Sequence, residues 1–308
     1  MKPVICLMGP TASGKTPLAI EIAQHFPCEI ISVDSAMVYR EMDIGTAKPT
    51  PDVLRIVPHR LINILDPAQA YSAGQFCTDA LREIEEVICK GKIPLLVGGT
   101  MLYFRVLQQG LAPLPVANQT IRLTLATRAK QEGWEALYAY LETVDPHAAA
   151  RIHPSDKQRI QRALEVYELT GQPLTLLQKE TNSLSHYTMH YVAISPRDRS
   201  VLHTRIAERF QHMLALGLID EVKQLYARGD LSIELPSMRS VGYRQVRSYL
   251  AGDYSYETMH EKAVAATRQV AKRQLTWLRS WPQLTWFTYD SADEKKGIVE
   301  FIKKVITP

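Results

Sequence analysis

Residues 9–16, GPTASGKT, have the composition of a phosphate-binding loop. They lie between an apolar run at 4–8 and a helical pattern, where glycines let backbone N–H groups face an anion at the positive end of the helix. In such a loop Lys15 reaches the terminal phosphates and the Thr16 hydroxyl can ligate Mg²⁺. The predicted phosphate site consists of Gly9, Pro10, Thr11, Ala12, Ser13, Gly14, Lys15 and Thr16.

Asp34 directly follows a second apolar run, at 29–33. A nucleotide hydrolase also places a carboxylate at the end of a buried strand to organise Mg²⁺ and water. The apolar run that closes on Gly98-Gly99-Thr100 carries no acid, which leaves Asp34 as the only well-placed carboxylate. The loop therefore holds either a nucleotide or a phosphorylated group that leaves during the reaction, and spacing alone does not decide between them.

Strands and helices alternate along the first hundred residues. We expect strands over 3–8, 29–33, 59–65 and 93–97, and helices over 15–26 and 72–91, the second opened by a Ser72/Gln75 capping box. This order predicts an α/β fold with a parallel sheet covered by helices on both faces. Ligands of such sheets bind beyond the carboxyl ends of the strands, where the loop, Asp34 and Thr100 all lie.

Residues 113–190 have helical patterns without a convincing strand, including a helix that a Ser155/Gln158 capping box opens and Gly171 ends. We therefore predict an all-helical insertion over 113–190 in a catalytic core formed by 1–112 and 191–308. The core resumes with strands over 190–195 and 284–289 and is otherwise helical.

The bulk composition is that of an ordinary soluble protein, with 308 residues, 46% hydrophobic and 22% charged. No apolar run reaches membrane-spanning length, and the four cysteines lie in or beside apolar segments without CxxC pairs. These features favour buried thiols in the cytoplasm. The formal charge of +4 includes a basic excess over 239–279, which suits either a polyanionic partner or a solvated helix face.

Seven motifs together resemble the tRNA dimethylallyltransferase family across nearly the whole chain. They are GPTASGKT, VDSAMVYREMDIGTAKP (33–49), PHR (58–60), GGTMLYF (98–104), RIHPSDKQRIQRALEVYELTG (151–171), RSVGYRQ (239–245) and ATRQVAKRQLTWLR (266–279). The resemblance implies a P-loop kinase-like fold. It also implies transfer of a dimethylallyl group from dimethylallyl diphosphate to N6 of the adenosine 3′ to the anticodon, in tRNAs that read codons beginning with U. The loop would then hold the departing diphosphate, and Mg²⁺ is the expected cofactor.

An adenine amino group is a weak nucleophile, so a base that removes its proton assists the reaction. Asp34 is the candidate base. The resemblance assigns Arg209 to the departing diphosphate, Thr100 to the reacting groups and Arg122 to the flipped adenine or its flank. His59, in PHR, is taken as structural because histidines at strand starts usually are.

The target adenosine is stacked in a loop and has to be extruded before its N6 can react. Basic and aromatic residues then hold splayed bases and backbone phosphates. The predicted tRNA contacts are Asp34, Ser35, Ala36, Met37, Thr100, Arg122, Gln158, Arg159, Ile160, Gln161, Arg162, Arg239, Ser240, Val241, Gly242, Tyr243, Arg244, Lys272, Arg273, Gln274, Leu275, Thr276, Trp277, Leu278 and Arg279.

Three other functions compete with this one. A small-molecule kinase would bind ATP in the loop, and a transferase for free AMP, ADP or ATP would have little use for the insertion or the basic C-terminal segment. An RNA-binding module with a vestigial loop would not need Lys15, Thr16 and Asp34. We expect a monomer, with tRNA and dimethylallyl diphosphate as partners and no membrane. The lack of a C-terminal Cys/His cluster indicates a bacterial-type enzyme.

Overall fold

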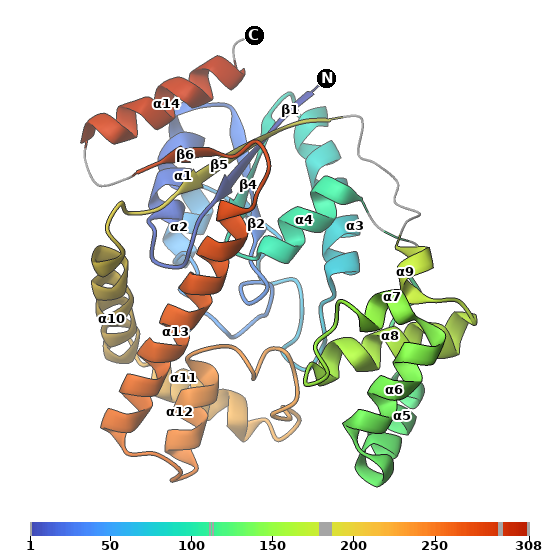
Figure 1. The fold of residues 1–308 in the computed structure, drawn as a ribbon. Helices are drawn as coiled ribbons and strands as arrows, with labels where there is room; N and C mark the ends of the chain where they lie inside the picture. Colours follow the sequence, from blue (N-terminus) through green and yellow to red (C-terminus); the bar gives the residue numbers. More distant parts are fainter. Residues whose placement is uncertain (1, 111, 113, 179–186, 289–291, 307–308) are drawn as a thin grey trace. The chain divides into compact units, whose positions relative to one another are not determined.

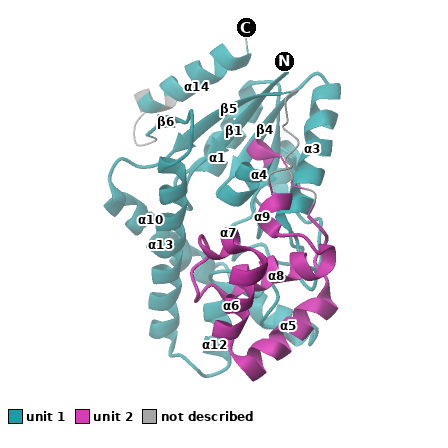
Figure 2. Cartoon of the chain, turned by 45° about the vertical axis from the view of Figure 1, so that its right-hand side comes forward, with its two compact units in different colours: residues 1–106, 185–308 teal, residues 107–184 magenta. Residues whose placement is uncertain are grey.

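The structure is a computed structural model that describes residues 2–110, 112, 114–178, 187–288 and 292–306. It divides into two compact units, which Figure 2 colours separately: residues 1–106 with 185–308, and residues 107–184. The insertion expected over 113–190 differs from the second unit at both ends. Residues 187–190 already belong to a strand of the first unit, because they pair with the N-terminal strand.

Unit 1 contains a six-stranded sheet, whose order is β3-β2-β4-β1-β5-β6 (Figure 1). The strands are β1 (Lys2–Met8), β2 (Cys28–Val33), β3 (His59–Arg60), β4 (Ile93–Gly98), β5 (Tyr187–Ile194) and β6 (Thr285–Phe287). All neighbouring pairs are parallel. The central strand β1 is buried from Val4 to Met8, as expected for a parallel strand that helices cover on both faces. The predicted parallel α/β fold is confirmed.

One face of the sheet packs against helices α1 (Lys15–His25) and α14 (Ala292–Ile306). Leu18 and Ile22 of α1 and Ile298 of α14 join Ile5 and Leu95 of the sheet in one fully buried cluster. Burial of side chains of this size stabilises the fold by about 1.5–3 kcal/mol each. The cluster fixes the start of α1, and therefore the phosphate loop, relative to the strand ends.

The helix α3 (Ala73–Cys89) also packs against β2 and β4. Its apolar side chains recur at helical spacing, with Phe76, Ala80, Ile84 and Val87 buried. The predicted Ser72/Gln75 capping box opens the helix. The remaining helices of the first half are α2 (Pro51–Ile56) and α4 (Met101–Gln109).

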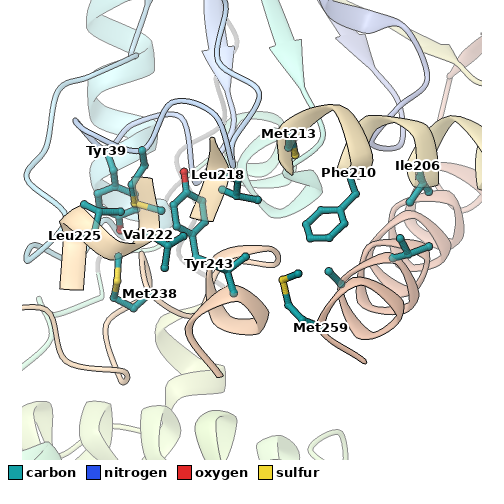
Figure 3. Packing of buried hydrophobic residues seen from close by; sticks show 14 of the residues in the cluster. Tyr39, Ile206, Phe210, Met213, Leu218, Val222, Leu225, Met238, Tyr243 and Met259 are labelled. Carbon is teal, nitrogen blue, oxygen red and sulfur yellow. The ribbon is translucent and has the colours of Figure 1, made fainter. Parts of the chain in front are cut away.

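The C-terminal half of unit 1 is mainly helical. It consists of α10 (Arg199–Ala215), α11 (Leu218–Ala227), α12 (Tyr243–Leu250) and the long α13 (Tyr256–Arg279). The helices α10 and α12 both pack against α13. Together with residues 38–42 they enclose a second core, which includes Phe210 and Met259 (Figure 3). This core holds α10 and α13, which both reach the carboxyl edge of the sheet.

Helices are the only regular elements in the described residues of unit 2, as the sequence predicts for the insertion. Its helices are α5 (Gln119–Glu132), α6 (Trp134–Val144), α7 (Pro146–Ala149), α8 (Lys157–Thr170) and α9 (Leu174–Leu177). Leu137, Leu141, Ile160 and Leu164 are fully buried in its own core. Gly171 ends α8 in the left-handed conformation, as predicted.

Three local predictions are wrong in detail. The strand expected over 59–65 stops at Arg60, because Leu61 and Asn63 have positive φ values of 60° and 58°. The cap of α8 is Asp156, whose side chain accepts from the Arg159 N–H group, rather than Ser155. The strand expected over 284–289 spans only Thr285–Phe287, and Tyr289 lies outside the described residues.

Of the four cysteines, Cys6, Cys28 and Cys77 are buried, whereas Cys89 is exposed at the end of α3. Burial raises the pKa of the Cys77 thiol to about 11. The expectation of buried thiols therefore fails for Cys89. No helix within the described residues is long and apolar enough to cross a membrane.

Candidate active site

The phosphate loop leaves β1 at Met8 and enters α1 at Lys15. A Cβ atom on Gly9 would lie 2.5 Å from the Ile194 carbonyl oxygen, so only glycine fits against the neighbouring strand. Ala12 and Gly14 adopt positive φ values of 63° and 91°. Such left-handed turns direct successive N–H groups inward, which is the geometry that binds phosphate oxygens.

Lys15 lies over this loop. Its Nζ atom donates to the Pro10 carbonyl oxygen at 2.6 Å and approaches the Ser13 Oγ atom at 3.5 Å. Burial lowers the pKa of Lys15 to about 7, with a further lowering from the Arg209 charge and a partial offset from Asp34. A bound polyanion would raise this pKa again, so Lys15 can take up a proton as it binds phosphate.

Arg209 extends from α10 to the phosphate loop. Its guanidinium group donates to the Thr11 Oγ1 atom at 3.0 Å and to the Thr46 carbonyl oxygen at 3.4 Å. Burial lowers its pKa, and the Asp34 carboxylate opposes that effect. Arginine still remains charged at neutral pH, so the site holds a second fixed cation beside Lys15.

Asp34 lies at the carboxyl end of β2, where its Oδ1 atom accepts from the Ala36 and Met37 N–H groups at 2.8 and 3.3 Å. No hydrogen bond from another described residue reaches the second carboxylate oxygen. Thr100, at the end of β4, accepts from the Ser35 N–H group at 3.0 Å through its Oγ1 atom. The structure thus fixes one oxygen of Asp34 and joins its turn to Thr100.

Gln274 of α13 joins the loop to the end of β4. Its Oε1 atom accepts from the Thr11 N–H group, and its Nε2 atom donates to the Gly99 carbonyl oxygen, both at 2.8 Å. The prediction from the sequence assigned Gln274 to the tRNA contacts and did not include this pair of hydrogen bonds. A signal existed, because Gln274 is a polar residue on the face of α13 that also carries buried Ala271 and Leu278.

These side chains surround one cavity in unit 1. It is lined by Thr11, Lys15, Thr16, Ile30, Ser32, Asp34, Met37, Pro49, His59, Val97, Gly98, Gly99, Arg209 and Gln274. The lining combines two cations and loop hydroxyls with an aspartate and with apolar side chains such as Ile30 and Val97. An anion fits beside the cations, and a hydrocarbon fits against the apolar part.

His59 lines the cavity, although the sequence predicts a structural role for it. Its Nδ1 atom lies 2.8 Å from the Val57 carbonyl oxygen, which requires the proton on Nδ1 in the neutral ring. Burial lowers the pKa of His59, although the Val57 contact opposes it. The ring is therefore neutral near pH 7, which adds no cation to the cavity.

Comparison with known proteins assigns the chain to a family. Residues 37–281 match the family described as "IPP transferase", and residues 2–63 match "Isopentenyl transferase". The tRNA dimethylallyltransferase of Coxiella burnetii (strain RSA 493 / Nine Mile phase I) is 54% identical over 304 residues, which cover 98% of this chain and 97% of that protein. The chain belongs to the tRNA dimethylallyltransferase family.

Solved structures of this family agree with the fold. The tRNA isopentenylpyrophosphate transferase of Bacillus halodurans is 36% identical with a TM-score of 0.72, over 99% of this chain and 97% of that one. The corresponding protein of Staphylococcus epidermidis is 35% identical with a TM-score of 0.69, over 98% and 99%. A eukaryotic dimethylallyltransferase acting on tRNA is 27% identical with a TM-score of 0.81, over 99% of this chain and 80% of that one.

The residues predicted to contact tRNA in this family member differ in exposure. In unit 1 the side chains of Ser35, Arg239, Arg244, Lys272, Arg273, Thr276 and Arg279 are exposed, whereas Ala36, Met37, Ser240, Val241, Leu275 and Trp277 are half-buried. Trp277 stacks with Arg105, whose guanidinium carbon lies 5.4 Å from the ring centroid. Gly242 is buried and opens α12 with a φ of 94°.

Three predicted contacts belong to hydrophobic cores instead. Ile160 is fully buried inside unit 2, and Tyr243 and Leu278 are 1% and 0% exposed within unit 1. Their side chains cannot reach a nucleic acid in this conformation. These three residues were predicted as tRNA contacts because they lie within motifs in which the neighbouring residues are exposed.

Two arginines of unit 2, Arg122 and Arg162, converge on Glu165, a fully buried carboxylate. Arg122 donates to its two oxygens at 2.9 and 3.2 Å, and Arg162 donates at 2.8 Å. Gln161 donates to the Arg122 carbonyl oxygen at 3.1 Å. Exposed Gln158 and Arg159 lie at the start of α8, where Arg159 pairs with Asp156 at 3.4 Å. These residues remain predicted tRNA contacts.

Proposed function

We propose that this protein transfers a dimethylallyl group from dimethylallyl diphosphate to N6 of the adenosine 3′ to the anticodon, in tRNAs that read codons beginning with U. One observation carries the proposal: Asp34 lies at the same cavity as two cations and an apolar wall. A kinase site needs a carboxylate for Mg²⁺ beside the phosphates but no hydrocarbon pocket. An allylic diphosphate and an amine acceptor use all three features.

The leaving group is bound by the loop, Lys15 and Arg209. When the allylic C–O bond breaks, negative charge develops on the diphosphate. The inward-facing N–H groups and the two cations are already in place to stabilise it. Loss of one such donor in a water-excluded site typically costs about a hundredfold to a thousandfold in turnover. The Thr11 hydroxyl and the Thr46 carbonyl keep the Arg209 guanidinium oriented toward the loop.

The acceptor reacts next to Asp34. As the C–N6 bond forms, the C–O bond breaks and the N6 proton moves to a carboxylate oxygen of Asp34. Because backbone N–H groups hold its Oδ1 atom, the Oδ2 atom is the one that takes the proton. Thr100 holds the same turn through Ser35, and we assign it a contact with the reacting groups. Ser35, Ala36 and Met37 then pack the extruded adenine.

Mg²⁺ is the proposed cofactor. Thr16 lines the cavity and would supply a hydroxyl ligand. The described residues hold no cluster of three or more His, Cys, Asp or Glu that could hold a metal ion. Mg²⁺ usually keeps several waters and binds through few protein groups plus substrate phosphates, which fits this donor set. When bound, it would neutralise charge on the diphosphate. Chelation with EDTA should abolish transfer.

The protein binds the anticodon stem-loop through exposed cations of both units. In unit 1 these include Arg239, Arg244, Lys272 and Arg273, and in unit 2 Arg159. We further propose a monomeric cytoplasmic enzyme. Three of the four cysteines are buried thiols, which is typical of a reducing compartment. Light scattering of the purified protein tests the monomer.

A transfer assay tests the proposed function. Purified protein, Mg²⁺ and labelled dimethylallyl diphosphate are incubated with unmodified tRNA, AMP or ATP. Label on tRNA alone is the expected result. Label on the free nucleotides would indicate an adenylate isopentenyltransferase, and ATP consumption without transfer would indicate a kinase.

A further inference from the structure

The loop of residues 42–48 supplies one of the two groups that orient Arg209, the Thr46 carbonyl oxygen. This 42–48 loop contributes no side chain to the lining of the cavity. Its own position is set from outside the cavity, by groups of α11 and α12.

Glu221, in the first turn of α11, is the main anchor of the 42–48 loop. Its Oε2 atom accepts from the Asp43 and Ile44 N–H groups at 2.9 and 2.7 Å, and its Oε1 atom accepts from the Gly45 N–H group at 3.0 Å. Three consecutive backbone N–H groups thus converge on one carboxylate. This is the arrangement by which a backbone binds an anion, here supplied by the protein itself.

Tyr243 completes this anchor from α12. Its hydroxyl donates to the Glu221 Oε1 atom at 2.6 Å, and its ring is buried in the core that Figure 3 shows. Burial and the Glu221 charge raise the pKa of Tyr243, so the hydroxyl stays protonated and donates. A Cβ atom on Gly45 would lie 2.4 Å from the ring, so the ring packs directly against the loop backbone.

A carboxylate fits these four donors and a neutral amide does not. Glutamine at position 221 would keep one acceptor oxygen but direct an NH₂ group at N–H or O–H donors. A second contact fixes the far end of the loop, where Lys48 donates to the Tyr39 carbonyl oxygen at 2.7 Å and to Asp43 at 2.6 Å. With both ends held, the Thr46 carbonyl has one position relative to Arg209.

We propose that Glu221 and Tyr243 are positioning residues for diphosphate binding: they hold the 42–48 loop so that Arg209 faces the phosphate loop. This inference rests on the proposed function of the cavity. It also assigns Tyr243 of the RSVGYRQ segment to the diphosphate site through the loop. Neither residue lines the cavity, so in this proposal the anchor acts on the diphosphate through the Thr46 carbonyl and Arg209.

The test measures pyrophosphate affinity by calorimetry, the KM for dimethylallyl diphosphate and the Kd for tRNA. Glu221→Gln should weaken pyrophosphate binding about tenfold and raise the KM for the diphosphate similarly, the scale of one lost charge-assisted contact. The kcat at saturation should also fall, because Arg209 stabilises the departing diphosphate, whereas the Kd for tRNA should change less than about threefold. Asp220→Asn is the matched control, because it removes a neighbouring charge from the same helix turn and is exposed.

A double-mutant cycle separates positioning from a general effect on folding. In an Arg209→Ala background, Glu221→Gln should weaken pyrophosphate binding no further, because Arg209 is its only route to the phosphate. An equal weakening in both backgrounds would overturn the inference. If Glu221→Gln does not fold, Tyr243→Phe serves instead, because it keeps the ring and removes one donor to Glu221. Tyr243→Phe should bind pyrophosphate about threefold more weakly. Unchanged pyrophosphate binding would overturn the proposal.

Wild-type binding distinguishes this inference from the proposed function. If wild-type protein binds neither pyrophosphate nor dimethylallyl diphosphate, the function of the cavity and the inference both fail. If it binds both and transfers label to tRNA while the cycle is additive, the function stands and the positioning role fails.

Discussion

Replacing Gln274 distinguishes a residue of the diphosphate site from a tRNA contact. Gln274→Ala removes two hydrogen bonds, leaving the Thr11 N–H group and the Gly99 carbonyl oxygen without their partner. An unsatisfied buried group costs about 1–3 kcal/mol. Since the site is only half-buried, the low end applies to each group, about 2 kcal/mol in total. The two bonds hold the loop in the shape that binds phosphate, so restoring that shape opposes binding by at most this amount. Since about 1.4 kcal/mol is tenfold, pyrophosphate affinity should fall by up to about thirtyfold.

Two further variants sharpen this prediction. Gln274→Glu keeps an acceptor for Thr11 but places a negative oxygen against the Gly99 carbonyl and beside the diphosphate, so it should bind pyrophosphate more weakly than Gln274→Ala. Lys272→Ala, on the exposed side of α13, should weaken tRNA binding and leave pyrophosphate affinity unchanged. Calorimetry with pyrophosphate and filter binding with tRNA measure the two affinities. If Gln274→Ala loses tRNA affinity and keeps pyrophosphate affinity, the assignment to the diphosphate site is refuted.

Four other outcomes follow from the structure. Burial lowers the pKa of Lys15 to about 7 in the free protein, and a bound diphosphate raises it, so pyrophosphate affinity should fall as the pH rises above about 7. Lys15→Arg should lose this pH dependence of affinity. A pH dependence equal to that of the wild type would contradict the role of Lys15. Asp34→Asn should lower turnover at least about a hundredfold with tRNA binding nearly intact, and near-normal single-turnover rates would exclude it as the base. Arg159→Ala should reduce the salt slope of tRNA binding by about one, whereas an unchanged slope removes it from the interface. Gly45→Ala should lower the melting temperature, because its Cβ atom would overlap the Tyr243 ring; calorimetric unfolding at the wild-type temperature would count against this packing.

The phosphate loop was predictable because its chemistry is local. Its eight residues form one turn between a strand and a helix, and the glycines, Lys15 and Thr16 carry the signal themselves. Asp34 and Thr100 were also predictable, since parallel strands place their carboxyl ends at one edge of the sheet. Here the order of strands and helices was enough to bring separate segments together.

Residues that reach the site from distant helices were harder to find. The periodicity of α10 alone would place Arg209 on a helix surface, and only the family resemblance led to its predicted role at the diphosphate. Gln274 lies one turn from buried residues, but the cations around it made the whole segment resemble a tRNA-binding surface. The anchor of Glu221 on the 42–48 loop joins segments far apart in the sequence, and no local pattern predicts which backbone a surface acid will meet.

Wrong predictions came from treating motifs as uniform. Ile160, Tyr243 and Leu278 lie at helix positions that face cores, so a helical wheel would have separated them from their exposed neighbours. The strand expected over 59–65 failed for a different reason. Its last residues pair with the segment after β2 instead, as the Asn63 and Ile64 N–H groups donate to the Met37 and Val38 carbonyl oxygens.

In the proposed reaction, N6 of one adenosine, next to Asp34, accepts the dimethylallyl group. Two anticodon stem-loops that differ only at the position 3′ to the anticodon test it most directly, one with adenosine and one with inosine, which has an oxygen in place of the amino group. Wild-type protein, Mg²⁺ and labelled dimethylallyl diphosphate should label the adenosine stem-loop and leave the inosine stem-loop unlabelled. Equal labelling of the two, or labelling of neither while pyrophosphate still binds, would contradict the account.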